Sequence, residues 1–297
     1  MPRNALIIGF GYIGRRMARR LRAADWHVAA LTRSADGIAA AQGLGIAAWQ
    51  GDLDQPSSLA DLPVTADTAV FYLAPPPTEG VTDPRMTHFL GALTVAPHAL
   101  IYISTTGVYG DSKGQMVTEE SPVNPETERA KRRVAAEAAL KNYAEQHPPM
   151  RHVVLRVSGI YGPDKLPLAR LQRGEPIVED SAHPSYVNVI QADDLVDICI
   201  AAAERAPRGA IYNVSSNRPV SMAAYMDVVA DAAGLQRPPR ISWDEAKTRI
   251  SPGMLSYLTE SRRVSSDKLL RELGLTLRYG DLKTGVAAAL AESPQSR

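Results

Sequence analysis

Apolar and polar positions follow two rhythms along the first half of the chain. Short β-branched or apolar runs lie at residues 5–9, 27–32, 45–49, 68–73, 100–104 and 152–157, and we predict each of them as a strand. Segments between them, such as 12–24 and 127–143, are rich in Ala, Arg, Glu and Leu at helical spacing. Strands that alternate with helices are typical of a parallel sheet wrapped by helices, so the pattern predicts an α/β fold with a doubly wound sheet.

Beyond Gly159 the pattern is looser and indicates a smaller lobe. We predict strands at 186–190 and 210–214 and helices at 192–204 and 222–233, the last with Ser221 as N-cap and Gly234 as its stop. Two further helices, at 266–274 and 281–291, precede a polar tail after Glu292 that we expect to fray. We therefore expect a first domain over residues 1–160, to which residues 185–216 return, and a smaller lobe formed mainly by 161–297.

A glycine-rich motif lies between the first predicted strand and the first predicted helix. It reads Gly9-Phe10-Gly11-Tyr12-Ile13-Gly14 and matches G-x-G-x-x-G in the context that a dinucleotide site requires. Gly9 permits the tight turn, Gly11 lets the backbone approach a pyrophosphate, and Gly14 lets the helix pack closely. We therefore expect this turn to bind a dinucleotide cofactor, and the alternative is a glycine turn that holds no ligand.

The end of the second strand indicates which dinucleotide the turn binds. NAD sites usually place an Asp or Glu there, which accepts hydrogen bonds from the ribose 2′-hydroxyl. Here the segment reads Leu31-Thr32-Arg33-Ser34, and the guanidinium of Arg33 suits a 2′-phosphate. We therefore expect NADP rather than NAD. Asp36 would reverse this choice if the strand ran further, and a solvated loop residue is the alternative role for Arg33.

Two later strand ends carry further candidate cofactor contacts. Asp52 and Leu53 follow the third strand, where a carboxylate can accept from an adenine amino group, although a plain Gly-Asp turn is the structural alternative. Leu73 and Ala74 end the fourth strand and lead into the run Pro75-Pro76-Pro77, a stiff loop without N–H donors. We predict Asp52, Leu53, Leu73 and Ala74 as part of the cofactor site.

Composition disfavours several other classes of protein. The 297 residues carry 33 basic and 32 acidic side chains with no long run of like charge, so neither nucleic acid nor an anionic membrane is an expected partner. No apolar stretch approaches the roughly 20 residues of a membrane-spanning helix. Cys199 is the single cysteine, which excludes an internal disulfide and favours the cytoplasm. The six histidines include no pair with metal-ligand spacing, so no metal is expected.

Five segments together resemble the extended short-chain dehydrogenase/reductase superfamily, and within it an atypical branch of NAD(P)-dependent epimerase/dehydratase proteins. They are the glycine motif, Gly51-Asp52-Leu53, Ser104-Thr105-Thr106-Gly107-Val108-Tyr109-Gly110, Arg156-Val157-Ser158-Gly159-Ile160-Tyr161-Gly162-Pro163 and Asp193-Asp194-Leu195. The resemblance implies a Rossmann domain, a small-molecule substrate of the sugar-nucleotide kind, and Thr105 as the residue that hydrogen-bonds the reacting oxygen. The alternative for Thr105 is a strand-end hydroxyl that satisfies only local backbone.

The sequence departs from the family at its usual catalytic pair, Tyr-x-x-x-Lys on the helix after the fifth strand. Aligned on the proline before that helix, the pair becomes Thr127 and Lys131, and aligned on Glu137 it becomes Arg129 and Arg133. Neither register contains a tyrosine. A threonine hydroxyl is a far weaker acid than a phenol beside a cation, so the standard mechanism of hydride exchange is in doubt.

Three interpretations stay open. Tyr109 or Tyr161 serves as the acid, with packing as the alternative role of both; Lys131 or an arginine binds an anionic substrate while solvent relays the proton; or the site binds NADP without turnover. We therefore hypothesise an NADP-dependent oxidoreductase or epimerase, with Thr105, Thr127 and Lys131 as candidate catalytic residues. The rival hypothesis is a non-catalytic NADP(H)-binding protein that reports redox state to a partner. The resemblance implies a homodimer that pairs through helices of the Rossmann domain. The alternative is that the arginine-rich helix of this chain faces solvent and takes no part in pairing.

Overall fold

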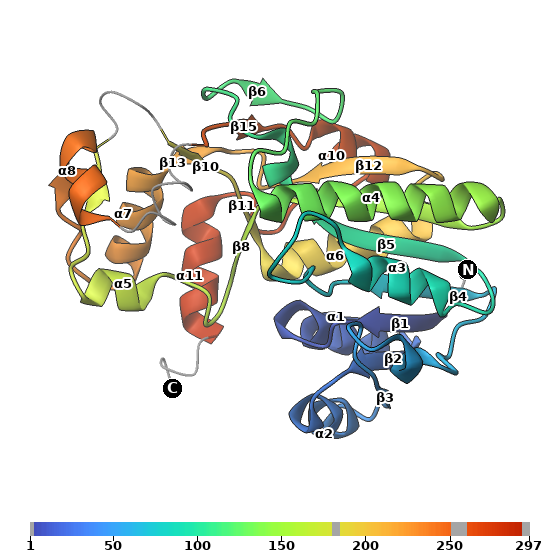
Figure 1. Ribbon diagram of the computed structural model, residues 1–297. Coiled ribbons are helices and arrows are strands. Elements are labelled where there is room, and N and C mark those ends of the chain that lie inside the picture. The colour runs from blue at the N-terminus through green and yellow to red at the C-terminus, as the bar shows by residue number, and fades with distance from the viewer. Residues whose placement is uncertain (1–2, 180–184, 251–259, 293–297) are drawn as a thin grey trace. The chain divides into compact units, whose positions relative to one another are not determined.

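The computed structural model describes residues 3–179, 185–250 and 260–292 (Figure 1). The polar tail after Glu292, which we expect to fray, lies outside the described residues. The chain divides into two compact units, each assembled from separate stretches of sequence. The first comprises Met1–Val108, Pro125–Arg156 and Val196–Tyr212, and the second comprises Tyr109–Asn124, Val157–Leu195 and Asn213–Arg297.

A seven-stranded sheet forms the centre of the first unit, in the order β12-β7-β5-β4-β1-β2-β3. Its strands are β1 (Asn4–Ile8), β2 (His27–Thr32), β3 (Ala47–Gln50), β4 (Thr68–Tyr72), β5 (Ala99–Thr105), β7 (Arg151–Val157) and β12 (Ala210–Val214). β1 pairs in parallel with β2 and β4, β2 pairs in parallel with β3, and β4 with β5. The carboxyl ends of these five strands therefore meet at one edge of the sheet, which is the edge where open α/β sheets bind ligands.

The predicted strands of the first half and the strand at 210–214 are confirmed, with ends that shift by at most two residues. They form because their side chains are apolar on both faces, as a sheet covered on both sides requires. β4 shows this most clearly, since all five of its residues are buried.

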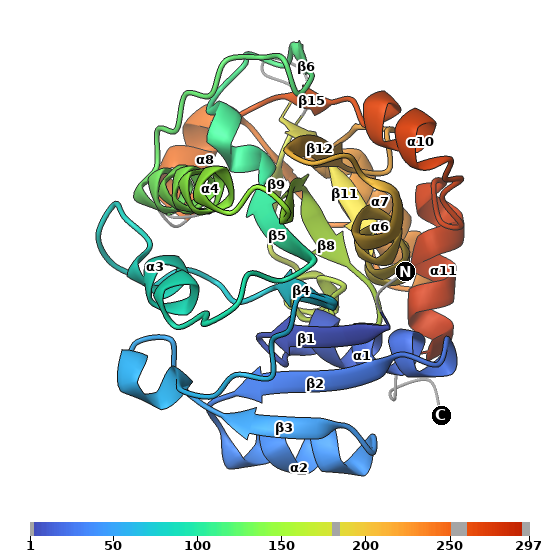
Figure 2. The ribbon, with the colours of Figure 1, turned by 90° about the vertical axis from the view of Figure 1, so that its right-hand side faces the viewer.

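Helices cover both faces of this sheet, so the doubly wound α/β class is confirmed. They are α1 (Tyr12–Ala23), α2 (Ala35–Gly43), α3 (Pro84–Gly91), α4 (Glu128–Gln146) and α6 (Ala192–Arg205). α3 and α4 lie on one side of the strands, with the Tyr72 ring 5.4 Å from the Phe89 ring of α3. α1 and α6 lie on the other side, joined by an ion pair of 3.0 Å between Arg20 and Asp197 (Figure 2).

Two helices of the first unit, α2 and α3, were not among the predicted elements. Both begin at a side chain that caps the helix: Ser34 accepts from the Gly37 N–H, and Asp83 accepts from the Met86 N–H. Pro84 at the first position of α3 adds a second start signal. These capping residues are therefore the sequence signal for the two helices, because α3 has only eight residues and α2 is rich in alanine and glycine.

The second unit consists of short paired strands and short helices around its own apolar core. Its elements are β6 (Met116–Val117), β8 (Gly159–Tyr161), α5 (Leu168–Gln172), β9 (Ile177–Val178), β10 (Tyr186–Val187), β11 (Val189–Gln191), β13 (Val220–Ser221), α7 (Met222–Ala232), β14 (Arg240–Ile241), α8 (Trp243–Arg249), β15 (Arg263–Val264), α10 (Asp267–Leu273) and α11 (Leu282–Glu292). The single strand predicted at 186–190 is two strands, β10 and β11, which pair with different partners. The core includes Tyr161, Met226, Val229 and Val286.

The predicted ends of α7 are confirmed. Ser221 caps its first turn by accepting from the Ala224 N–H at 3.0 Å, and Gly234 follows the helix with a φ of +64°. The predicted helices at 192–204, 266–274 and 281–291 correspond to α6, α10 and α11. Local capping chemistry therefore determines several helix ends of the second unit.

Candidate functional site

The glycine motif forms the turn between β1 and α1, at the carboxyl edge of the sheet. Gly9 has a φ of +96°, and a Cβ at this position would lie 2.8 Å from the backbone nitrogen of Ala74. A Cβ at Gly14 would lie 2.5 Å from the Gly9 carbonyl oxygen. Both positions therefore require glycine, one for its backbone conformation and for the approach of the loop after β4, and the other because α1 packs against the turn.

Gly11 differs from the other two glycines of the motif, because a Cβ here would meet nothing within 4 Å. It is the N-cap of α1, no side chain caps this helix, and no acidic residue lies in its first turn. An open space in front of helix N–H groups suits a pyrophosphate, which carries negative charge and accepts hydrogen bonds. The residues present thus fit the phosphates of a dinucleotide, with Phe10 in the turn and Tyr12 and Ile13 as the first residues of α1.

The remaining cofactor candidates lie around this turn in the first unit. β2 ends at Thr32, so Arg33 is the first residue beyond the strand and is exposed, whereas Asp36 lies in the first turn of α2. Thr32 is the register partner of Gln50, the last residue of β3. Arg33 therefore lies beside the start of the loop that carries Asp52, with no carboxylate at the end of β2 itself.

Two loops follow strands that end at the same edge of the sheet, and we call residues 51–55 the β3 loop and residues 73–77 the β4 loop. In the β3 loop Asp52 accepts from the Asp54 N–H at 3.0 Å, while Leu53 is buried. In the β4 loop the Leu73 N–H donates to the Ile8 carbonyl at 2.8 Å, and Ala74 approaches Gly9. The fold thus brings the predicted residues Leu73 and Ala74 against the glycine turn.

Thr105 is the last residue of β5 and is half-buried. Its hydroxyl oxygen accepts from the Gly107 N–H at 3.2 Å, which leaves the hydroxyl proton available to a further acceptor. β5 is the neighbour of β4, whose carboxyl end borders the glycine turn. The geometry places this hydroxyl at the carboxyl edge of the sheet.

Thr127 is the residue just before α4, and Lys131 lies within that helix. The Thr127 hydroxyl caps α4 by accepting from the Ala130 N–H at 3.2 Å. Lys131 is exposed, one turn further along the helix. These positions give neither side chain a defined part in the chemistry, so their catalytic role stays a prediction.

The alignment on Glu137 gives Arg129 and Arg133 instead, and one of these two side chains contacts the sheet. Arg133 donates from Nη1 to the Ile103 carbonyl at 2.7 Å and to the Tyr102 hydroxyl at 3.2 Å, while Arg129 is exposed. Glu137, one turn beyond Arg133, contacts β5 and β7. The contacts of Arg133 and Glu137 with the sheet were not predicted, although their i, i+4 spacing indicates that both share one face of α4.

The phenols offered as replacement acids are buried in their own units. Tyr109 donates to Asn213 Oδ1 at 2.7 Å inside the second unit. Tyr161 is 2% exposed, and burial raises the pKa of its phenol. In the first unit burial also raises the pKa of Tyr102, to about 12. Tyr102 and Tyr161 are therefore poor proton donors or acceptors near neutral pH, and the pairing of Tyr109 with Asn213 is that of a packed side chain.

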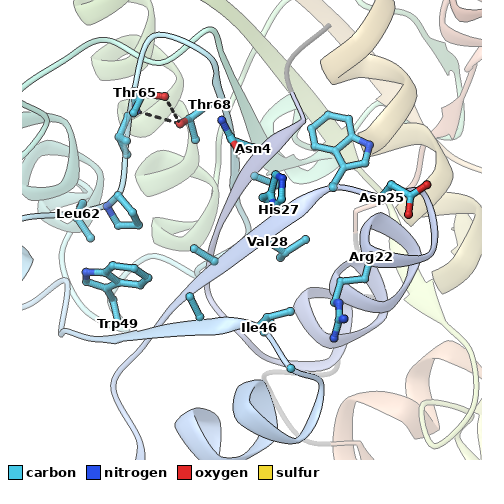
Figure 3. Close-up of a pocket in the computed structure, with 17 residues that line it drawn as sticks. Asn4, Arg22, Asp25, His27, Val28, Ile46, Trp49, Leu62, Thr65 and Thr68 are labelled. Atoms are coloured by element: carbon cyan, nitrogen blue, oxygen red, sulfur yellow. Dashed lines mark hydrogen bonds between the residues drawn. The ribbon is translucent and has the colours of Figure 1, made fainter.

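A cavity of about 870 Å³ lies at the opposite edge of the first unit's sheet (Figure 3). Asn4, His27 and Thr68, the first residues of β1, β2 and β4, line it together with Trp49 and Leu62. The glycine turn contributes no residue to its lining. The cavity is thus separate from the candidate cofactor site, which follows the carboxyl end of β1.

Two absences hold for the described part of the chain. No cluster of three or more His, Cys, Asp or Glu side chains is arranged to hold a metal ion within residues 3–179, 185–250 and 260–292. In the same ranges no helix has the length and apolar character that crossing a membrane requires.

A parallel sheet covered on both faces, with a glycine turn between its first strand and first helix, defines a Rossmann-type dinucleotide-binding protein. The chain belongs to the NAD dependent epimerase/dehydratase family, which matches residues 5–215. The superfamily resemblance drawn from the sequence motifs is thereby confirmed. Membership rests on sequence that includes the whole glycine turn, the β3 and β4 loops and α4.

The chain is similar along its length to several known proteins. Protein YeeZ of Escherichia coli strain K12 is 28% identical over 290 residues, which cover 94% of this chain and 97% of that protein. A solved structure of a functionally unknown conserved protein from Silicibacter pomeroyi has a TM-score of 0.82 at 26% identity, and the match covers 98% and 99% of the two chains. A UDP-glucuronic acid 4-epimerase from Bacillus cereus, solved with UDP-glucuronic acid and NAD, has a TM-score of 0.74 at 18% identity, with 96% and 97% covered. At that identity the last likeness shows the fold alone.

Proposed function

We propose that this chain binds NADP and acts as an NADP-dependent oxidoreductase or epimerase on a small polar substrate. The observation that carries the proposal is the open space at Gly11 in front of α1, with Arg33 and no carboxylate at the end of β2. Gly9, Gly11 and Gly14 would hold the pyrophosphate through backbone N–H groups, and Arg33 would hold the 2′-phosphate. The β3 and β4 loops would border the adenine and the nicotinamide halves.

Thr105 is the residue that we propose for orienting the substrate. The nicotinamide, when bound, supplies or takes a hydride. The Thr105 oxygen already accepts a hydrogen bond from Gly107, so its own proton is free to be donated to a carbonyl or alkoxide oxygen. Solvent supplies the proton of the reaction, because the phenols of Tyr102 and Tyr161 are buried with raised pKa values. A sugar nucleotide is the substrate class that the family and its relatives favour.

Equilibrium binding tests the cofactor part of this proposal. We expect NADPH to bind much more tightly than NADH, and Arg33→Ala to reduce that difference. Nicotinamide fluorescence titration of the wild type and the variant measures both affinities. Equal affinities of the wild type for NADPH and NADH would overturn the choice of NADP.

A second candidate function is a non-catalytic NADP(H)-binding protein that reports redox state to a partner. It is favoured by the position of Thr127, whose hydroxyl caps α4, and by the exposed Lys131. Absorbance at the reduced nicotinamide band, followed with a panel of carbonyl compounds, separates the two candidates. Turnover that falls in Thr105→Val supports the enzyme, whereas tight binding without turnover, joined to cofactor-dependent association with another protein, supports the second candidate. We place the protein in the cytoplasm, because a single buried thiol fits a reducing compartment.

A further inference from the structure

Helix α3 contacts both the β3 loop and the β4 loop through Arg85, in its first turn. Arg85 Nε donates to Asp54 Oδ1 at 2.7 Å and Nη2 to Asp54 Oδ2 at 2.5 Å, so the guanidinium forms a fork on the carboxylate of the β3 loop. The same guanidinium donates from Nη1 to the Pro75 and Pro76 carbonyls of the β4 loop, at 3.0 and 3.3 Å. One side chain therefore connects the two loops.

The β4 loop has a particular need for such a donor. Pro75, Pro76 and Pro77 have no N–H groups, so this part of the loop cannot donate to a neighbouring segment, and its carbonyls need donors from elsewhere. A guanidinium offers five N–H groups in a rigid plane, which lets Arg85 serve a carboxylate and two carbonyls at once. Lysine, as a single point charge, lacks this geometry.

A second residue of α3 holds the β3 loop. His88 lies three residues after Arg85, on the same face of the helix, and its Nδ1 is 2.7 Å from the Leu53 carbonyl oxygen. Because a carbonyl only accepts, Nδ1 carries the proton in this contact. α3 thus anchors the segment that carries Asp52 and Leu53 at two successive residues, Leu53 and Asp54.

The ion pair of Arg85 with Asp54 also affects the charge near Arg33. Asp54 is exposed, and its hydrogen bond with Arg85 holds the pKa of its carboxyl below the ordinary value, with Arg33 among the other cations that act in the same direction. Arg33 lies beside the start of the β3 loop, because the Gly51 N–H donates to the Thr32 carbonyl at 3.1 Å. If Arg85 were neutral, the Asp54 carboxylate would compete for Arg33 and repel a 2′-phosphate bound there.

We propose that Arg85 is a positioning residue that sets the preference for NADP over NAD. It holds the β3 and β4 loops at the spacing that the cofactor needs, and it neutralises Asp54 so that Arg33 is left to a 2′-phosphate. This inference rests on the NADP binding proposed above. It adds two residues, Arg85 and Asp54, that do not themselves contact the cofactor in the proposed site.

The experiment measures NADPH and NADH dissociation constants for four variants by fluorescence titration. In Arg85→Gln we expect weaker binding of both cofactors and an NADPH preference lowered roughly fivefold, the size of a screened interaction between a phosphate dianion and a carboxylate. In the double variant Asp54→Asn with Arg85→Gln the preference should return, because the competing charge is gone, while the loss of affinity for both cofactors remains. Arg85→Lys should keep the NADPH preference, because the positive charge beside Asp54 is retained. It should bind both cofactors more weakly, because lysine cannot form the forked hydrogen bonds.

Arg237→Gln is the matched control. Arg237 forms the same kind of fork on Asp231 in the second unit, with Nε and Nη2 at 2.8 and 2.7 Å from the two carboxylate oxygens. Its loss should change neither dissociation constant, and circular dichroism confirms that each variant is folded.

Three outcomes separate the proposals. Wild-type binding constants in Arg85→Gln would overturn the positioning role. An equal loss for both cofactors, with the preference unchanged in Arg85→Gln, would overturn the role in specificity. A wild-type protein that binds neither cofactor would instead overturn the proposed function itself.

Discussion

Glu137 of α4 and Arg156 of β7 form a buried ion pair in the first unit. Arg156 Nη2 donates to Glu137 Oε2 at 2.8 Å, and the two side chains are only 5% and 11% exposed. The Ser104 hydroxyl of β5 donates to the other carboxylate oxygen, Oε1. Both oxygens of Glu137 are thus occupied, and α4 is tied to two neighbouring strands, one turn beyond the Arg133 contact with Ile103.

Glu137→Ala tests how much this network stabilises the fold. The substitution leaves the buried Arg156 guanidinium without its carboxylate, and removing one partner of a buried pair costs about 3–5 kcal/mol. Urea unfolding measures the loss in the free energy of unfolding. Glu145→Ala is the control on the same helix, because its pair with Lys141 is exposed with an N–O distance of 3.9 Å, and we expect a loss of less than about 1 kcal/mol. Equal losses in both variants would contradict the importance of the buried pair.

Gly11→Ala separates the fold from cofactor binding. Its Cβ meets no protein atom within 4 Å, so we expect an unchanged melting temperature. The same methyl group would occupy the space in which the pyrophosphate is proposed to lie, so NADPH affinity should fall at least roughly tenfold, which corresponds to about 1.4 kcal/mol. Gly43→Ala, at the end of α2, also meets nothing within 4 Å and serves as the control with normal binding. A Gly11→Ala protein with wild-type NADPH affinity would argue against a pyrophosphate at this turn.

Tyr72→Phe should make the protein more stable. The ring packs against Phe89 and Tyr102, but its fully buried hydroxyl has no hydrogen-bond partner among the described residues. Burying a hydroxyl without a partner costs about 1–3 kcal/mol, so its removal should raise the free energy of unfolding by about 1 kcal/mol. Tyr109→Phe is the matched comparison, because its buried hydroxyl donates to Asn213, and here we expect a loss of about 1 kcal/mol. Equal effects of both changes in denaturant unfolding would refute this assignment.

Asp83→Asn should change how stability depends on pH. Asp83 caps α3 through Oδ1, is 4% exposed, and burial raises the pKa of its carboxyl above the ordinary value of 3.8. The folded state therefore binds this proton more tightly than the unfolded state does, so stability from this group is present below pH 3.8 and is lost as the pH rises through the folded pKa. Asparagine keeps the capping oxygen without a charge.

We therefore expect Asp83→Asn to be more stable than the wild type at neutral pH. The difference should shrink as the pH falls toward and below 3.8, where the wild-type carboxyl is protonated in both states. Urea unfolding at neutral and acidic pH measures it. A difference of the same size at both pH values would show that the charge of Asp83 is not its origin.

Short-range sequence patterns were sufficient to predict the strands of the sheet and the glycine turn. A strand such as β4 is a continuous apolar run, and the glycine motif has a fixed spacing between a strand and a helix, so both can be found within a few neighbouring residues. Helix α3 was not predicted because it has only eight residues, although Asp83 and Pro84 mark its start. Arg85 was missed with it, since no local pattern shows that one guanidinium reaches Asp54 and Pro75.

The sequence by itself determined the α/β class and the edge of the sheet that carries the glycine turn. Each of these depends on residue types at fixed short spacings, which periodicity and backbone sterics interpret directly. Only the tertiary structure decided which α4 side chains face the sheet. Thr127 caps the helix and Lys131 is exposed, whereas Arg133 and Glu137 contact β5. The physical reason is that the rotation of a helix against a sheet is set by packing and by buried charge pairing between segments far apart in the chain, which no local spacing encodes.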